Sequence, residues 1–151
     1  MSGKVLKSHP RPDRDELVLM ALVRAAELFK RRSAAVFREH GLSFSQYNAL
    51  RVLEATPQAE ASLSTVGGLM MVSKHNLSGI AKRLEAGGFV RRRESQGDER
   101  VRLLALTPKG RQVLRLIAQG QEQNIAQMLA PFSRSQREAL LAMLRGMLAQ
   151  G

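Results

Sequence analysis

Apolar residues recur at intervals of three and four along most of this chain, the spacing that gathers them on one face of a helix. Six segments show this spacing, and glycine, proline or short polar stretches separate them. The pattern therefore predicts six helices, at residues 13–40, 43–55, 62–70, 73–86, 109–130 and 133–148. Residues 56–61, which include Pro57, are expected to form a loop.

Several of these helices begin with a capping signal. Asp13-x-x-Glu16, Ser43-x-x-Gln46 and Ser133-x-x-Gln136 have the form of a capping box, in which two side chains satisfy free amides of the first turn. Thr107-Pro108 places a capping hydroxyl ahead of a proline that suits the first helical position. These signals fix the expected starts of the first, second, fifth and sixth helices.

Residues 89–106 follow a different pattern. Residues 89–94 and 101–106 read as two strands, and the turn formers Ser, Gly and Asp lie between them at 95–100. A helix followed by an arginine-rich hairpin is the sequence form of a winged helix-turn-helix, whose hairpin reaches DNA phosphates or the minor groove. The expected fold is therefore mainly α with a small β-hairpin wing (α+β).

The helix at 73–86 has one apolar and one polar side. The apolar side carries Leu77, Ile80, Ala81 and Leu84. The opposite side is cationic and low in relief, with Gly79 at its centre, where a base edge can approach. Such a face suits the major groove of DNA, and a solvated amphipathic helix is the alternative. The residues expected to contact DNA from this helix and the first wing strand are Ser73, Lys74, His75, Asn76, Ser78, Gly79, Lys82, Arg83 and Arg92.

The distribution of charge favours DNA as the partner. The chain has a formal net charge of +11, and residues 73–115 hold 11 Lys or Arg against 4 Asp or Glu, a net +7. Clustered positive charge is the electrostatic footprint of a nucleic-acid binder, because neutralised phosphates release counterions. No basic segment combines this charge with a strongly apolar, aromatic face, so a membrane surface is not the expected partner.

Composition also limits the cellular compartments and the kinds of chemistry that are possible for this chain. The chain has no cysteine, which excludes disulfides, cysteine-type zinc sites and thiol chemistry. No apolar run approaches the roughly 20 residues of a membrane span, and the N-terminus lacks the apolar region of a signal peptide. We therefore expect a cytoplasmic protein.

The outer helices are more apolar than the small DNA-binding core can bury. We expect the first, fifth and sixth helices to pack against a second copy of the chain, and a monomer with a larger core is the alternative. The resulting organisation is a flexible N-terminal arm at 1–12, a helical dimerisation region at 13–41 and 108–151, and a winged helix-turn-helix DNA-binding domain at 42–107.

Four stretches together resemble the MarR family of bacterial transcription regulators. They are GLSFSQYNALRVL, VSKHNLSGIAKRLEAGGFVRR, GDERVRLLALTPKG and the amphipathic C-terminal helices. The wing is the most specific part, because Asp98-x-Arg100 followed by Leu106-Thr107-x-x-Gly110 matches the family's D-x-R…L-T-x-x-G pattern. The resemblance implies a homodimer with a triangular helical base and two winged lobes. It also implies that Arg100 enters the minor groove and that Asp98 holds it by an ion pair.

The resemblance further implies a sequence-specific regulator, here expected to be a repressor, that binds a pseudo-palindromic operator and is released by a small aromatic or phenolic ligand. Such ligands bind between the dimer base and the DNA-binding lobe. The residues that surround this junction by chain position are Phe37, His40, Phe44, Tyr47 and Arg51. The alternative is that the aromatic residues among them are ordinary core.

Two other classes of function fit the sequence less well. For an enzyme, Glu39 and His40 are sequence neighbours that point to different helix faces, and neither GxxxxGK[ST] nor GxSxG occurs. We therefore expect no catalysis, no cofactor and no bound metal. A non-specific architectural DNA-binding protein would share the positive charge, but it would not need a recognition face of mixed hydrogen-bonding residues.

Overall fold

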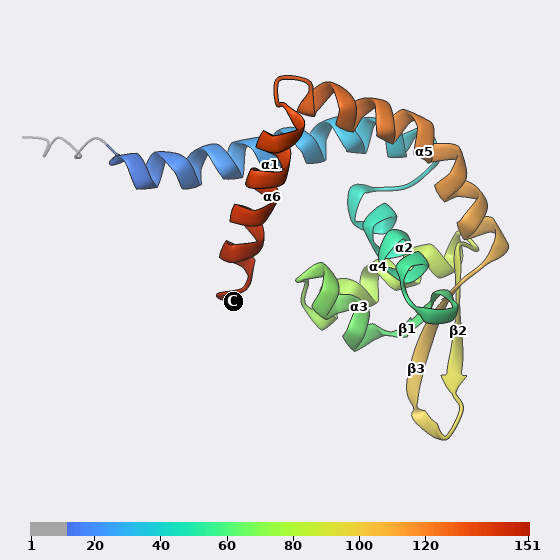
Figure 1. The fold of residues 1–151 in the computed structure, drawn as a ribbon. Helices are drawn as coiled ribbons and strands as arrows, with labels where there is room; N and C mark the ends of the chain where they lie inside the picture. Colours follow the sequence, from blue (N-terminus) through green and yellow to red (C-terminus); the bar gives the residue numbers. More distant parts are fainter. Residues whose placement is uncertain (1–11) are drawn as a thin grey trace, which may run out of the picture.

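The computed structural model describes residues 12–151, apart from the side chain of Glu99, and contains six α-helices and a small antiparallel sheet (Figure 1). The elements in chain order are α1 (Arg14–Arg38), α2 (Phe44–Ala55), the 3-10 turn η1 (Pro57–Ala59), β1 (Glu60–Ser62), α3 (Leu63–Met70), α4 (Lys74–Ala86), β2 (Val90–Ser95), β3 (Asp98–Leu106), α5 (Pro108–Leu129) and α6 (Arg134–Leu148). The expected fold class is confirmed. The flexible arm expected at 1–12 lies, except for Pro12, outside the described residues.

The caps begin the helices as the sequence predicts. At α2, Gln46 N donates to Ser43 Oγ at 3.2 Å while Ser43 N donates to Gln46 Oε1 at 2.8 Å, which is a complete capping box. The box at Ser133 is also complete. At α1, Glu16 N donates to Asp13 Oδ1 at 2.8 Å, but the Glu16 side chain makes no return contact to Asp13 N among the described residues, so the capping box expected here is only half formed.

Part of the expected loop at 56–61 is a strand. Residues Glu60–Ser62 form β1, which pairs with β3 in the sheet order β1-β3-β2. The third helix consequently begins at Leu63 rather than at Ser62. Ser62 is its N-cap, and its hydroxyl accepts a hydrogen bond from Thr65 N at 3.1 Å.

The wing, defined here as β2 and β3 with their connection, turns more tightly than the expected six-residue tip. Ser95 pairs with Asp98, which leaves Gln96 and Gly97 as the turn. Gly97 has a φ of +99°, a value that glycine adopts readily and that short hairpin turns require. The register shifts between Glu94, which pairs with Arg102, and Ser95, so Arg100 lies within β3 in an irregular segment.

One apolar core holds together residues 42–107, which are expected from the sequence to bind DNA and are called the DNA-binding lobe for that reason, and it anchors them to the first and fifth helices. Phe37 of α1 and Ile117 of α5 are fully buried in this core beside Leu50 and Leu84. Complete burial of such side chains contributes about 1.5–3 kcal/mol each. The lobe is therefore fixed to the ends of α1 and α5 rather than joined to them by a free linker.

The helical base, defined as α1, α5 and α6, is packed in one part and open in another. Where α1 lies along α5, Ser33 Oγ accepts hydrogen bonds from Gln121 Nε2 and Asn124 Nδ2, both at 3.1 Å, and all three side chains are buried. By contrast, no residue of α6 is buried within the described chain. Figure 1 shows α6 turning back from the end of α5, crossing α1 in this view and ending at the C-terminus to the left of α3.

Candidate nucleic-acid interface

The helix α4, called the reader helix below, presents the two sides that its sequence predicts. Leu77, Ile80, Ala81 and Leu84 are buried. The polar side is open, because Lys74, His75, Asn76, Lys82 and Arg83 are exposed while Ser78 and Gly79 are partly exposed. Ser73 is the N-cap, and its hydroxyl accepts a hydrogen bond from Asn76 N at 3.2 Å.

A tight turn sets the reader helix against α3. Met71 ends α3 with a left-handed φ of +54°, and Val72 N donates to Gly67 O at 3.1 Å. Gly67 is buried against the reader helix, since a Cβ there would lie 3.4 Å from Leu77 Cδ2. The two helices therefore approach closely at Gly67, whereas nothing lies within 4 Å of a Cβ at Gly68.

The centre of the polar side is bordered by a cation. A Cβ at Gly79 would lie 3.8 Å from Arg83 Nη1, so the guanidinium folds back along the helix beside the bare glycine. The low relief expected at Gly79 is thus combined with a forked hydrogen-bond donor, the group that recognises guanine edges and phosphates best.

Ion pairs fix the wing to its neighbours. Arg92 Nε lies 3.1 Å from Glu85 Oε2 at the end of the reader helix, and Arg93 Nε lies 3.2 Å from Glu60 Oε2 of β1. Arg92, expected to contact DNA, is therefore already paired with a carboxylate. Its contact with DNA stays a prediction, and the structure gives it a role in positioning the wing.

At the wing tip, Asp98 contacts the backbone of Arg100. Asp98 Oδ1 accepts a hydrogen bond from Arg100 N at 3.0 Å, while no ion pair between the two side chains occurs among the described residues. The ion pair implied by the family resemblance is therefore absent from this structure. The carboxylate instead shapes the irregular segment that carries the arginine.

A cationic hollow of about 400 Å³ lies where the wing faces the starts of α3 and the reader helix. The residues that line this cationic hollow are Ser62, Leu63, Ser64, Lys74, Arg100, Val101 and Arg102. Lys74 and Arg100 are predicted from the sequence to contact DNA, whereas Arg102 and Ser64 are not. The signal for Arg102 was its spacing, because residues two apart on a strand point to the same face.

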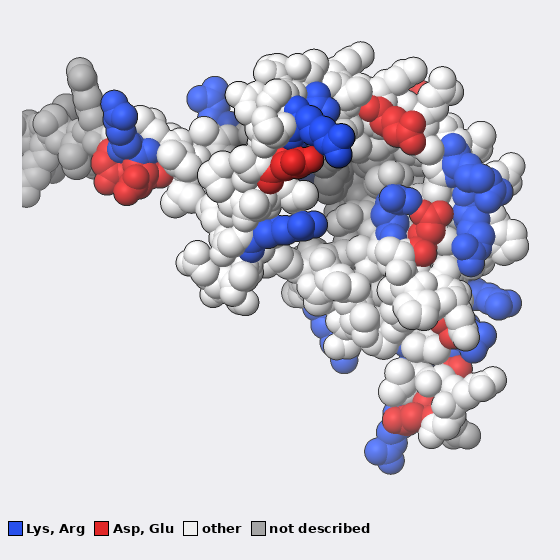
Figure 2. Space-filling model, viewed as in Figure 1, with Lys and Arg blue, Asp and Glu red and all other residues white. Residues whose placement is uncertain are grey.

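Basic side chains are also visible over the outer edge of the molecule. Figure 2 shows them along the edge where the start of α5 meets the wing, and again at the wing tip beside acidic groups.

Within residues 12–151, no cluster of three or more His, Asp or Glu side chains is placed to hold a metal ion. No helix in the same range is long and apolar enough to cross a bilayer.

The L-T-x-x-G segment joins the wing to α5. Thr107 Oγ1 donates to Gly88 O at 2.7 Å and accepts a hydrogen bond from Gly110 N at 3.1 Å. Thr107 N also donates to Phe89 O at 3.1 Å. Gly110 is required by this packing, because a Cβ there would lie 2.3 Å from Phe89 O and 2.6 Å from Leu106 Cδ1.

Three of the five predicted ligand-binding residues form an aromatic cluster. The rings of Phe37 and Tyr47 stack with centroids 3.9 Å apart, and the Phe44 ring lies 6.0 Å from that of Phe37. Phe37 is completely buried. Burial raises the pKa of Tyr47 above its ordinary value, while the nearby Arg51 charge opposes this shift.

The structure does not bring all five of these residues to one cavity. Phe44 lines a hollow of about 400 Å³ with Arg38 and Ser43, whereas His40 lines a different hollow on the α5 side. Arg51 is ion-paired with Glu54 on the same helix. The assignment of these residues to a ligand site stays a prediction.

Comparison with known proteins agrees with this architecture. Residues 40–101 match the family model described as "MarR family". The transcriptional regulator PecS of Dickeya dadantii (strain 3937) is 30% identical over 138 residues, which cover 89% of this chain and 83% of that protein. The crystal structure of Sco3205, a MarR family transcriptional regulator from Streptomyces coelicolor in complex with DNA, has a TM-score of 0.83 and 26% identity over 95% of this chain and 92% of that one.

The structure of Bordetella bronchiseptica BpsR, whose DNA binding is regulated by 6-hydroxynicotinic acid, is 25% identical over 87% of this chain and 98% of that one, with a TM-score of 0.72. The fold, the wing motif and the similarity to PecS over most of both chains all indicate the same family. The chain belongs to the MarR family of transcriptional regulators.

Proposed function

We propose that this protein is a homodimeric, sequence-specific transcriptional repressor that a small aromatic ligand releases from its operator. The observation that carries the proposal is the exposed polar side of the reader helix beside the cationic hollow of Lys74, Arg100 and Arg102. A helix of this kind fits the major groove, while the wing beside it reaches phosphates and the minor groove.

Each part of this surface has a distinct task on DNA. Asn76 and Lys82 lie on the open side of the reader helix, where they can meet base edges. The cationic hollow measures about 400 Å³, which leaves room for a phosphate. Its basic residues come from two elements, the reader helix and β3. Arg100 extends this surface to the minor groove. Phosphate contacts supply affinity, and base contacts supply specificity.

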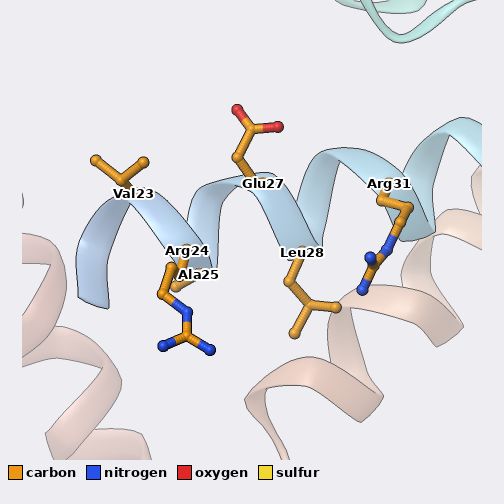
Figure 3. A pocket seen from close by; sticks show the side chains of 6 residues that line it. All are labelled: Val23, Arg24, Ala25, Glu27, Leu28 and Arg31. Carbon is orange, nitrogen blue, oxygen red and sulfur yellow. The ribbon is translucent and has the colours of Figure 1, made fainter. Parts of the chain in front are cut away.

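Support for a homodimer comes from the apolar surface of the helical base. Leu17, Val18 and Leu19 of α1 are exposed, as are Leu141, Met143 and Leu148 of α6. A hollow of about 550 Å³ also lies along α1, where Arg24, Leu28 and Arg31 point to one side and Val23 and Glu27 to the other (Figure 3). A second copy would cover this surface and place two reader helices on one duplex.

Repression follows from the size of the complex. Two reader helices would occupy half-sites about one helical turn apart, roughly 34 Å, and two wings would extend the footprint on both sides. A dimer at a promoter would therefore cover DNA that RNA polymerase needs. Ligand release is supported by the similarity to BpsR, whose DNA binding is regulated by 6-hydroxynicotinic acid.

The proposal is tested by selecting bound duplexes from a random-sequence pool with the full-length protein. We expect enrichment of a pseudo-palindrome, bound at least about 10³-fold more tightly than random duplex at physiological salt. Arg100→Ala should weaken binding to A·T-rich flanks. Arg115→Ala removes the same charge from an exposed position of α5 outside the cationic hollow, so it is the matched control and should change affinity less than twofold.

Equal affinity for selected and random duplexes would favour the non-specific architectural alternative. An Arg100→Ala protein with unchanged affinity would instead contradict the role given to the wing tip. A reporter gene placed behind the selected site tests repression separately, because an activator would raise its expression.

A further inference from the structure

Buried polar side chains occur at one place among the described residues. They are Ser33 of α1 and Gln121 and Asn124 of α5, and at most 7% of each residue is exposed. The other buried side chains that the structure describes are apolar. Because burying a polar group costs free energy unless it is hydrogen-bonded, a group of three in one place indicates a specific role.

These three side chains, called the polar cluster below, bond to one another across two helices. Ser33 Oγ accepts hydrogen bonds from Gln121 Nε2 and Asn124 Nδ2, both at 3.1 Å. Asn124 Nδ2 also lies 3.5 Å from Gln121 Oε1. Within the described part of the chain, no buried side-chain nitrogen or oxygen lacks a hydrogen-bond partner. The polar cluster is therefore fully paired when α1 lies on α5 as it does here.

The polar cluster lies one helical turn beyond the core that anchors the DNA-binding lobe. Ser33 comes four residues before Phe37 on α1, and Gln121 comes four residues after Ile117 on α5. Phe37 and Ile117 are fully buried in that core. Residues four apart share a face of a helix, so the facing sides of α1 and α5 carry the core at one level and the polar cluster at the next. Figure 1 shows these parts of the two helices side by side.

The two helices also approach closely at this level, since a Cβ at Gly120 would lie 3.0 Å from Val36 Cγ1. Apolar side chains alone fit several positions of one helix along another at similar cost. The polar cluster fits one, because a shift along the helix axis separates both amides from the shared hydroxyl and leaves buried groups without partners. A buried polar residue fixes the register of paired helices in coiled coils for the same reason.

We propose that the polar cluster fixes the register of α1 on α5 and thereby limits the protein to one spacing between operator half-sites. Both helices enter the core of the DNA-binding lobe, so their register sets where the lobe lies relative to the helical base. In a homodimer that shares this base, the register also sets the distance between the two reader helices. Adjacent base pairs are about 3.4 Å apart, so a small shift of the lobe would favour a different spacing. The part of this inference that concerns DNA rests on the proposed function.

Apolar replacement of the polar cluster separates register from stability. The triple variant Ser33→Ala, Gln121→Leu and Asn124→Leu removes all partners together, so no buried group is left unpaired and the fold should be kept. The double variant Gln121→Met and Asn124→Leu keeps the Ser33 hydroxyl, which can bond to a carbonyl of its own helix. Gln127→Ala is the matched control. It removes an exposed hydrogen bond between the same two helices, in which Arg32 Nη2 donates to Gln127 Oε1 at 2.8 Å.

The register is measured on the free protein, without DNA. The chain has no cysteine, so Asp15→Cys on α1 and Gln119→Cys on α5, both at exposed positions, carry the only two spin labels. Labelled chains are mixed with excess unlabelled protein, and pulsed EPR records the distance within one chain. We expect one narrow distance distribution with the native polar cluster and with Gln127→Ala. In the triple variant it should broaden or gain a second peak, displaced by up to about 5.4 Å, the rise of one helical turn.

Spacing is measured with the selected operator and with versions that have one base pair more or one fewer between the half-sites. The wild type and Gln127→Ala should lose at least about tenfold in affinity for both altered operators, whereas the triple variant should lose less than about threefold. A folded triple variant with one narrow distance distribution and wild-type discrimination would overturn the proposal. If the triple variant does not fold, the double variant decides in the same way. Failure of both to fold would overturn the proposal as well, because the polar cluster would then be needed for the fold itself.

The two proposals fail in different ways. If the protein binds no specific duplex, the proposed function is wrong, while the distance measurement still decides whether the polar cluster fixes the register. If an operator is selected and the triple variant has a broader distance distribution but still rejects both altered operators, the link from register to half-site spacing is overturned.

Discussion

Phe37 of α1 and Tyr47 of α2 stack with their ring centroids 3.9 Å apart and their planes inclined by 18°. Phe37 is fully buried and Tyr47 is partly buried. Burial is the main reason that the pKa of Tyr47 is raised, and Arg51 and Glu54 act in opposite directions on it. The stack thus connects the DNA-binding lobe to the helical base through a group whose ionisation would disturb both.

The pKa shift predicts how stability depends on pH at this contact. Since the folded-state pKa is above the unfolded value of about 10, the contribution of Tyr47 is fully present below pH 10 and is lost as pH rises through the folded pKa. The chain has one tyrosine and no tryptophan, so ultraviolet absorbance of the phenolate reports this group alone. We expect the folded protein to titrate at higher pH than the denatured chain, and coincident titrations would contradict the burial of the phenol.

A second prediction separates positioning arginines from phosphate-binding arginines. Arg102→Gln should reduce the slope of log affinity against log salt by about 0.9, because each phosphate contact on B-DNA contributes that amount. Arg92→Gln should change the slope by less than about 0.3, since the charge of Arg92 is already paired with Glu85. Titrations at four or five salt concentrations measure both slopes. Equal reductions would show that Arg92 exchanges Glu85 for a phosphate on DNA.

A third prediction concerns two glycines in helices. Gly110→Ala should lower the free energy of unfolding by about 1–3 kcal/mol, because its Cβ would overlap the backbone oxygen of Phe89. Gly68→Ala is the matched control and should raise stability by up to about 1 kcal/mol, since its Cβ meets nothing within 4 Å and alanine favours helix. Denaturant unfolding measures both. A Gly110→Ala protein as stable as the wild type would contradict the close packing of α5 on the wing.

A fourth prediction tests assembly through α6. Removal of residues 131–151, or the single change Leu141→Asp on the exposed apolar side of α6, should convert the dimer to a monomer and abolish specific DNA binding. Arg134→Ala, at a side chain that is 93% exposed, should leave the dimer intact. Sedimentation measures the mass, and circular dichroism checks that the remaining helices are folded. A truncated protein that sediments as a dimer would exclude α6 from the interface.

Local signals were enough to predict most of the helical architecture. The capping boxes at Ser43 and Ser133 and the N-cap at Thr107 are confirmed at the residues the sequence indicates. The apolar stripe of the reader helix is buried as expected. These features depend on residues within a few positions of one another, and so a single sequence contains the information that fixes them.

Features that depend on distant residues were missed. The strand β1 is three residues long and exists because Glu60–Ser62 meets residues 103–105 of β3, a pairing that no local pattern indicates. The cationic hollow likewise joins the start of α3 to the wing, so Arg102 gained its importance from neighbours about 40 residues away. The residues predicted to bind a ligand were identified as a group, but the structure places Phe37 in the core and Phe44 and His40 at two separate hollows.

The isolated position of α6 has a consequence for gene control. No residue of α6 is buried within one described chain, so the free energy that would hold this helix in place comes from association with a second chain. That association depends on the protein concentration. If only the dimer binds an operator, then at concentrations where most chains are monomers, operator occupancy rises with roughly the square of the chain concentration. Halving the concentration of chains, as happens when a cell doubles its volume without new synthesis, would then lower operator occupancy more than twofold without any ligand.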